Sequence, residues 1–256
     1  MTPEYTAQLA TELLLAGLFI VLGTGLFATL LALVHVRRNR ASRLEKPRSA
    51  SLAPAYRPSL FEQSCRWLVV KGGHLAPVQT ALGLHNPIPC SWGEGLSCVA
   101  THKLFVSPPV KGWIMVVGQS LPDPSEDIDR CFHFITRFSR VLGQVQFFYS
   151  NRALNHHAWV QADRGQIVRA YAWAGETLWD QGKPTQAEID LGLKCFAYGE
   201  TAGAIDVSAG ESAVPNAERV TALAGRWSFD PTTVDERMLR TGIGVAGDST
   251  CSAPRS

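Results

Sequence analysis

The sequence lacks the short motifs that mark several large enzyme classes. It contains no G-x-x-x-x-G-K-[S/T] segment and no G-x-S-x-G segment, and no two of its six cysteines have C-x-x-C spacing. The first absence leaves a P-loop nucleotide site without support, and the second does the same for the commonest hydrolase nucleophile. No motif in the chain therefore points directly to a reaction.

The chain also lacks a charge excess outside one short segment. Of its 24 basic and 22 acidic residues, six basic and three acidic residues (Glu4, Glu12 and Glu45) lie before residue 49, which leaves 18 basic and 19 acidic residues in the rest. A nearly neutral domain has no basic field that would hold nucleic acid nonspecifically. We therefore expect no nucleic-acid partner.

Charged residues are absent from positions 13–34 (LLLAGLFIVLGTGLFATLLALV). A helix of that length rises about 33 Å, enough to cross a hydrocarbon core of about 30 Å. A secretory signal peptide would need preceding basic residues and a shorter apolar core, whereas this flank carries Glu4 and Glu12. The sequence predicts a transmembrane helix over residues 13–36, preceded by a short extracytoplasmic N-terminus of residues 1–12.

Six basic residues follow the apolar stretch, and no Lys or Arg precedes it: Arg37, Arg38, Arg40, Arg43, Lys46 and Arg48. The positive-inside bias places this segment and everything after it in the cytoplasm. The six side chains are expected to contact anionic headgroups, although they can also serve only as a topology signal. These features predict a single-pass protein of the bacterial inner membrane with a cytoplasmic C-terminal domain.

Small residues form a stripe on the predicted transmembrane helix. Thr24, Ala28 and Ala32 are spaced four apart, although no strict G-x-x-x-G occurs. Small side chains let helix backbones approach closely in lipid, so a homodimer through this helix is one alternative.

The predicted membrane topology decides the chemistry of the cysteines, which all follow the apolar stretch: Cys65, Cys90, Cys98, Cys131, Cys195 and Cys251. In a cytoplasmic domain they are expected to be reduced and mostly buried. With the opposite topology, three disulfides could form in any of 15 arrangements.

The chain divides into a basic, Pro- and Ser-containing linker (37–59), an α+β domain (60–241) and a flexible tail (242–256). Helices are expected at about residues 60–70, 76–84, 124–142, 185–197, 217–227 and 231–240, and strands at 104–106, 113–117, 145–149, 158–162, 167–173 and 177–179. Asp163-Arg164-Gly165-Gln166 is typical of a hairpin turn, and Thr185 with Glu188 is typical of a capping box. Hairpins in place of strand–helix–strand alternation favour a mainly antiparallel sheet with flanking helices.

A histidine pair is the most suggestive polar cluster. His156 and His157 stand where a strand is expected to begin, and Asp163 follows closely in sequence. One histidine could act as a general base oriented by a carboxylate, but adjacent strand residues point to opposite faces, so at most one can enter a given site. The alternative is that both are structural.

Cysteine and glutamate side chains supply weaker catalytic candidates. Cys90 could pair with His157 as a nucleophile, and Glu94 stands between two glycines and could face a cleft. Cys90, Cys98 and His102, with His85 as a fourth ligand, could hold zinc, but their spacing is unlike that of common zinc modules. Buried thiols and a turn glutamate are the more ordinary interpretation, and we expect no metal or cofactor.

Large aromatic residues gather on the expected meander. Arg169, Tyr171 and Trp173 alternate along one strand and should share a face. Arginine beside aromatic residues is typical of a recognition surface for a protein, a base or a sugar, although core packing accounts for large aromatics more often. These three residues are the predicted binding surface.

Two further patterns match known motifs only in part. Residues 242–247 spell G-x-G-x-x-G, but they follow a predicted helix and leave too little chain for a nucleotide-binding βαβ unit. Residues 220–234 loosely resemble a helix-turn-helix, but acids such as Asp230 at the start of its second helix would repel phosphate.

The sequence therefore predicts a noncatalytic interaction or sensor module held at the membrane, where a protein partner would be concentrated. One alternative is a membrane-tethered hydrolase or transferase that uses a Cys/His or His/acid site. A weaker alternative is a membrane-bound DNA-binding regulator.

Overall fold

The computed structural model describes residues 59–62, 64–101, 103–200, 215–234 and 242–249. None of the helices in these ranges has the length and apolarity that crossing a bilayer requires. The predicted transmembrane helix, its small-residue stripe, the six basic residues after it and most of the linker lie outside the described ranges, so the anchor stays a prediction.

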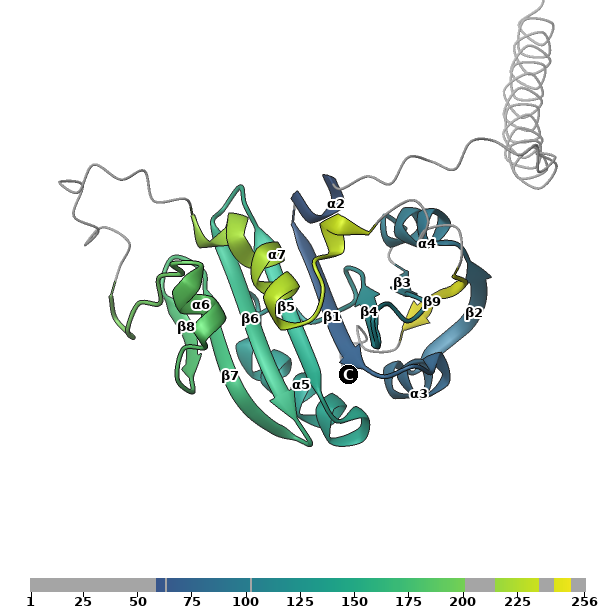
Figure 1. Cartoon of the computed structure of the whole chain (residues 1–256), viewed down its shortest axis with the longest axis horizontal. Coiled ribbons are helices and arrows are strands. Elements are labelled where there is room, and N and C mark those ends of the chain that lie inside the picture. Colours follow the sequence, from purple (N-terminus) through teal and green to yellow (C-terminus); the bar gives the residue numbers. More distant parts are fainter. Residues whose placement is uncertain (1–58, 63, 102, 201–214, 235–241, 250–256) are drawn as a thin grey trace, which may run out of the picture. The chain divides into compact units, whose positions relative to one another are not determined.

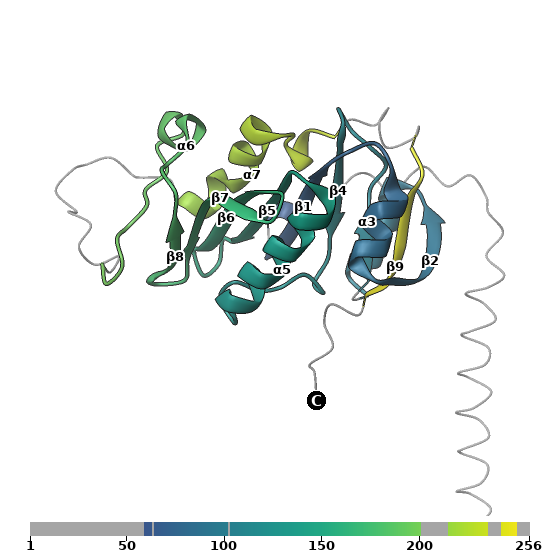
Figure 2. The ribbon, with the colours of Figure 1, turned by 90° about the horizontal axis from the view of Figure 1, so that it is seen from below.

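The described domain is built on one antiparallel sheet with helices on both faces (Figures 1 and 2). The nine strands lie in the order β2-β9-β3-β4-β1-β5-β6-β7-β8. This confirms the predicted mainly antiparallel sheet with flanking helices. The strands are β1 (Cys65–Lys71), β2 (Leu84–Cys90), β3 (Leu104–Val106), β4 (Trp113–Val117), β5 (Val145–Asn151), β6 (His156–Asp163), β7 (Gln166–Trp173), β8 (Thr177–Gln181) and β9 (Gly244–Ser249). The helices are α2 (Ser59–Glu62), α3 (Leu75–Leu82), α4 (Trp92–Val99), α5 (Ile128–Leu142), α6 (Gln186–Asp190), α7 (Asn216–Trp227) and the 3-10 turn η2 (Pro231–Thr233).

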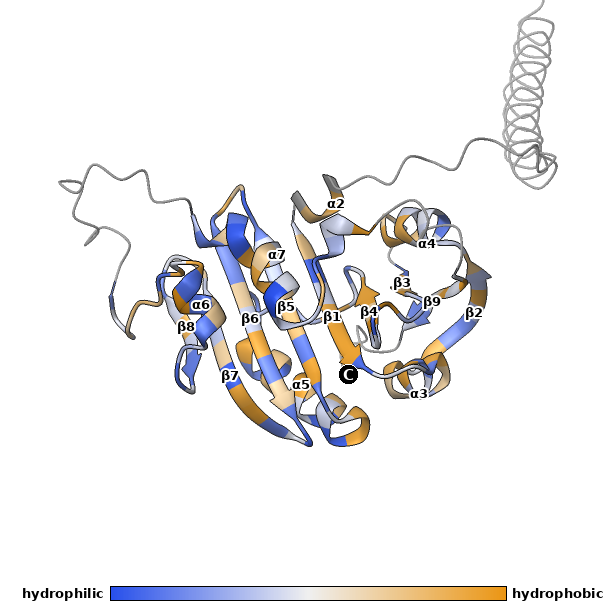
Figure 3. Cartoon of the chain, viewed as in Figure 1, coloured by the Kyte–Doolittle hydropathy of each residue, from blue (hydrophilic) through white to orange (hydrophobic). Residues whose placement is uncertain are grey.

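The central strand β1 corrects the predicted helix at residues 60–70. Its apolar side chains divide between the two faces: Trp67 and Val69 join one core, and Leu68 and Val70 join the other. A strand buried on both faces shows no polar alternation, so its periodicity cannot be distinguished from that of a short buried helix. Figure 3 shows hydrophobic colours along most of β1.

Helices α3 and α5 cover one face of the sheet. α5 carries Cys131, Phe134, Ile135 and Phe138 on its buried side and ends at Gly143, as its apolar spacing predicts. Its N-cap is Asp127, whose side chain accepts a hydrogen bond from the Arg130 amide at 2.8 Å. The helix therefore begins a turn later than the sequence suggested.

Helices α2, α4 and α7 contribute side chains to the core on the opposite face. α7 packs on β5 and β6 through Val220, Leu223 and Ala224. Pro231–Thr233 after it forms a single 3-10 turn, and residues 235–240 lie outside the described ranges. α7 therefore covers the sheet, and most of the second helix of the helix-turn-helix pattern lies outside the described ranges.

Two local signals in the sequence are confirmed. Arg164 and Gly165 have positive φ angles of 48° and 84° between β6 and β7, as a tight hairpin turn requires. Thr185 and Glu188 form the predicted capping box, with hydrogen bonds in both directions, although α6 is shorter than the predicted 185–197. Both signals depend on contacts within four residues, which the sequence alone specifies.

Strand β9 corrects the predicted flexible tail. Gly244–Ser249 pairs with β2 on one side and β3 on the other, inside the sheet. A Cβ atom on Gly244 would lie 2.5 Å from the Val106 carbonyl oxygen, and one on Gly247 would lie 2.8 Å from the His85 carbonyl oxygen. The glycines that resembled a loop or a nucleotide-binding motif therefore permit close strand packing.

Candidate functional site

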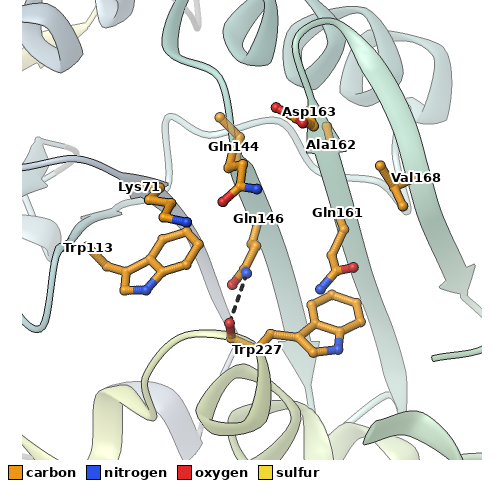
Figure 4. A pocket seen from close by; sticks show the side chains of 10 residues that line it. Lys71, Trp113, Gln144, Gln146, Gln161, Ala162, Asp163, Val168 and Trp227 are labelled. Carbon is orange, nitrogen blue, oxygen red and sulfur yellow. Dashed lines mark hydrogen bonds between the residues drawn. The ribbon is translucent and has the colours of Figure 1, made fainter. Parts of the chain in front are cut away.

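A cleft of about 400 Å³ opens on the α7 face of the sheet, at the part that α7 leaves uncovered (Figure 4). Its volume lies in the range of small-molecule sites. The residues that line it come from β1, β4, the β5–β7 meander and the end of α7: Lys71, Trp113, Gln144, Val145, Gln146, Gln161, Ala162, Asp163, Val168 and Trp227.

Strand register arranges the polar side chains of the cleft in two rows. In the outer row, Lys71 on β1 pairs with Trp113 on β4, and the backbone N–H of Lys71 donates to the backbone carbonyl of Gln144 at 3.0 Å. Because Val145 pairs with Ala162, Gln144 stands opposite Asp163. In the inner row, Gln146 pairs directly with Gln161, so their side chains lie side by side on this face.

The wall of the cleft is the C-terminal end of α7. Trp227 is the last residue of this helix, where backbone carbonyls have no partner within the helix. The Gln146 side-chain amide donates to the Trp227 carbonyl at 3.2 Å. The indole Nε1 donates to Thr185 Oγ1 at 3.3 Å, and its ring packs 5.6 Å from the Phe148 ring. Trp227 is therefore held in place before any ligand arrives.

Gln146 has an unmatched acceptor. The residue is only 6% exposed, and its Oε1 atom is buried without a hydrogen-bond partner. Leaving such an acceptor unpaired costs about 1–3 kcal/mol, so buried amide oxygens in folded proteins are nearly always paired. A donor from a molecule in the cleft would remove this cost.

Charges in the cleft are few and opposite. The Lys71 ammonium lies 6.0 Å from the centre of the Trp113 ring, and Asp163 lies two strands away on β6. Asp163 also makes a long, exposed ion pair of 3.9 Å with Arg164. The cleft thus combines two half-buried indoles, three glutamine amides and one charge of each sign.

The prediction that Arg169, Tyr171 and Trp173 form an exposed binding surface is wrong, because all three side chains are buried. The three residues share the α7 face, as predicted, but they are 1%, 0% and 4% exposed. Residues 185–196 cover them: the Phe196 amide donates to the Tyr171 hydroxyl at 2.9 Å, and the Phe196 ring packs 4.9 Å from Trp173. A partner cannot contact this part of the face.

Arg169 instead belongs to a buried ionic network. Its Nε donates to Glu188 Oε1 at 2.9 Å, and its Nη1 donates to Asp180 Oδ1 at 2.6 Å. Trp159 Nε1 donates to the same Glu188 oxygen at 2.8 Å. Burial lowers the pKa of Arg169, but the hydrogen bond with Asp180 and the contacts with Glu188 outweigh it, so the pKa is raised and the guanidinium stays charged.

His156 and His157 point to opposite faces of β6, as the sequence implied. His157 is 3% exposed, with its Nδ1 3.0 Å from the Asn155 carbonyl and its Nε2 3.2 Å from the Asn216 amide nitrogen. Burial lowers its pKa to about 4. His157 is therefore neutral near pH 7, stacked on Trp159 at 5.5 Å, and serves packing.

Cys90 and Glu94 do not converge with the histidines. Cys90 ends β2, which is six strand positions from β6 at about 4.8 Å per position. Burial raises the pKa of the Cys90 thiol to about 11, which disfavours the nucleophilic thiolate. Glu94 closes a capping box with Ser91 at the start of α4, and its Oε2 accepts from the Ser91 amide at 2.9 Å.

Within the described ranges, no three His, Cys, Asp or Glu side chains gather as metal ligands. His102 lies outside these ranges, so the set of Cys90, Cys98 and His102 is not tested. Comparisons with protein-family models, curated proteins and solved structures find no match to this chain. The cleft is therefore interpreted from its own geometry.

One signal of the cleft is visible in the sequence. Gln144 directly precedes the expected strand 145–149 and Gln146 is two residues further on, which favours one face for both side chains, and Gln161 follows on the next strand of the meander. The cleft around these glutamines also needs Trp227, which lies 66 residues beyond Gln161 in the chain. Only the packing of α7 brings Trp227 to Gln146, so local sequence does not reveal the contact.

Proposed function

We propose that this protein is a noncatalytic sensor or interaction module that binds a small polar ligand in the cleft between Trp113 and Trp227. The observation that carries the proposal is Gln146, whose buried Oε1 lacks a donor inside a cleft of ligand size. The indoles on both sides of the glutamine amides add apolar surface, and apolar surface around a few convergent polar groups is typical of ligand sites.

The composition of the cleft favours binding over catalysis. None of its ten lining residues is Ser, Thr, Cys, His, Tyr or Glu, so this site offers no common nucleophile and only Lys71 and Asp163 as proton-transfer groups. The histidine candidates of the enzyme alternative lie on β6, six strand positions from the β2 strand that Cys90 ends. The acids of the helix-turn-helix segment argue against the DNA-binding alternative.

We further propose that residues 13–36 anchor the module in the inner membrane with the domain in the cytoplasm. The apolar stretch and the basic residues after it support this topology. An anchored domain on a linker meets membrane partners at a raised local concentration. Ligand binding would then be reported to a protein at the membrane surface.

A reporter fused to the C-terminus tests the topology. Green fluorescent protein folds to its fluorescent form in the cytoplasm, and bacterial alkaline phosphatase is active only after export. We expect the first fusion to fluoresce in membranes and the second to be inactive. Active phosphatase with a dark fluorescent protein would contradict the proposed orientation.

Point variants test the cleft. Saturation-transfer NMR screens neutral, cationic and anionic compounds for binding to the full chain in lipid nanodiscs. We expect a ligand found in this way to bind at least tenfold more weakly to Trp113→Ala, because that variant lacks an aromatic anchor. Gln161→Ala should also weaken binding. Gln166→Ala, on an exposed residue of the same hairpin outside the cleft, is the matched control and should leave affinity unchanged. A screen without any ligand that depends on Trp113 would refute the proposal.

A further inference from the structure

We propose that the ligand of this cleft is a carbohydrate, recognised through one or more neutral pyranose rings. The inference rests on the proposed function and names its ligand class. Figure 4 shows the indoles of Trp113 and Trp227 on either side of the Gln146 amide, with Gln144 and Gln161 nearby.

The three amides match hydroxyl groups. Each glutamine side chain donates through its NH₂ group and accepts through its oxygen, and a hydroxyl group likewise does both. One N–H of the Gln146 amide donates to the Trp227 carbonyl, which leaves its second N–H and the unpartnered Oε1 acceptor for a ligand. A sugar hydroxyl could donate to Oε1, while Gln161 beside it could bond a neighbouring hydroxyl.

The two indoles match the apolar faces of a sugar ring. Pyranose rings present C–H bonds on their faces, and these carry a small positive charge that the negative face of an aromatic ring attracts. The outer row from Trp113 through Lys71 and Gln144 to Asp163 crosses three strand spacings, about 14 Å, which leaves room for more than one ring.

Electrostatics disfavours a charged ligand. α7 presents its C-terminal end at Trp227, and the partial negative charge there opposes phosphate or carboxylate groups. Lys71 is the single cation of the cleft, whereas phosphate sites usually combine several donors. The Lys71 ammonium, which lies 6.0 Å from the centre of the Trp113 ring, would also repel a cationic ligand that approached this indole.

Isothermal titration of the full chain in lipid nanodiscs tests the inference. The probes are maltohexaose, cellohexaose and hexa-N-acetylchitohexaose as free glycans, and nanodiscs that contain digalactosyl diacylglycerol as a lipid-borne glycan. We expect binding to at least one probe, weakened at least tenfold in both Trp113→Ala and Gln161→Ala and unchanged in Gln166→Ala. The free and lipid-borne arms show which source of sugar the cleft accepts.

The outcomes separate the two proposals. Sugar binding that the cleft variants leave unchanged overturns the inference. Failure of every sugar, together with a different compound that binds in a Trp113-dependent way, overturns the carbohydrate but leaves the proposed function standing. Absence of any cleft-dependent ligand overturns both. If Trp113→Ala does not fold, Gln161→Ala, with Gln166→Ala as its control, carries the test.

Discussion

Replacing Glu188 with alanine should lower the free energy of unfolding by about 3–5 kcal/mol, the usual cost of removing one partner from a buried ion pair. Glu188 is 1% exposed, and one of its oxygens accepts hydrogen bonds from both Arg169 and Trp159. Its loss leaves the guanidinium with Asp180 as its remaining carboxylate and leaves the Trp159 indole N–H without an acceptor. Urea unfolding followed by tryptophan fluorescence measures the change.

Asp190 provides the matched control on the same helix. It is exposed, and its hydrogen bond joins it to the exposed Gln186 at 2.7 Å. Asp190→Ala should therefore change stability by less than about 0.5 kcal/mol. Loss of less than 1 kcal/mol in Glu188→Ala would mean that the network does not hold α6 against the sheet.

Lowering the pH from 7 to 4 should destabilise the domain by roughly 3 kcal/mol through His157 alone. Its pKa is lowered to about 4 in the folded protein, chiefly by burial, from 6.5 in the unfolded chain. At a pH between these two pKa values, His157 binds a proton in the unfolded chain but not in the folded protein, so acid favours unfolding. The contribution of His157 is fully present above pH 6.5 and is lost as the pH falls towards 4.

Comparison with His157→Gln separates the contribution of His157 from that of the carboxylates, which also titrate in acid. Urea unfolding at pH 7, 6, 5 and 4 should show a shallower loss of stability in His157→Gln than in the wild type. His133→Gln removes an exposed histidine on α5 and should keep the wild-type slope. Equal slopes in all three proteins would contradict the burial argument.

Local signals in the sequence predicted much of the fold. The hairpin turn at Arg164 and Gly165, the capping box of Thr185 and Glu188 and the apolar stripe of α5 each specify their structure within a few residues. β1 and β9 could not be recognised in this way. β1 is buried on both faces and so shows no alternation, and β9 contains glycines that only its neighbours β2 and β3 explain.

The candidate site was harder to predict than the fold. Arg169, Tyr171 and Trp173 were correctly placed on one face, but the sequence did not reveal that residues 185–196 cover them. The cleft between Trp113 and Trp227 lies on another part of that face, and its position depends on where α7 ends. Long-range packing decides which part of a sheet face stays open, and that information is not local in sequence.

Fluorine NMR of the full chain with all seven tryptophans fluorinated tests the central claim most directly. Substitution of single tryptophans by phenylalanine assigns the resonances, and the titrant is the tightest-binding compound from the NMR screen. We predict that the signals of Trp113 and Trp227 shift on binding, while those of the fully buried Trp67 and Trp92 stay fixed. Shifts confined to other tryptophans, or none at all, would contradict the assignment of the cleft as the ligand site.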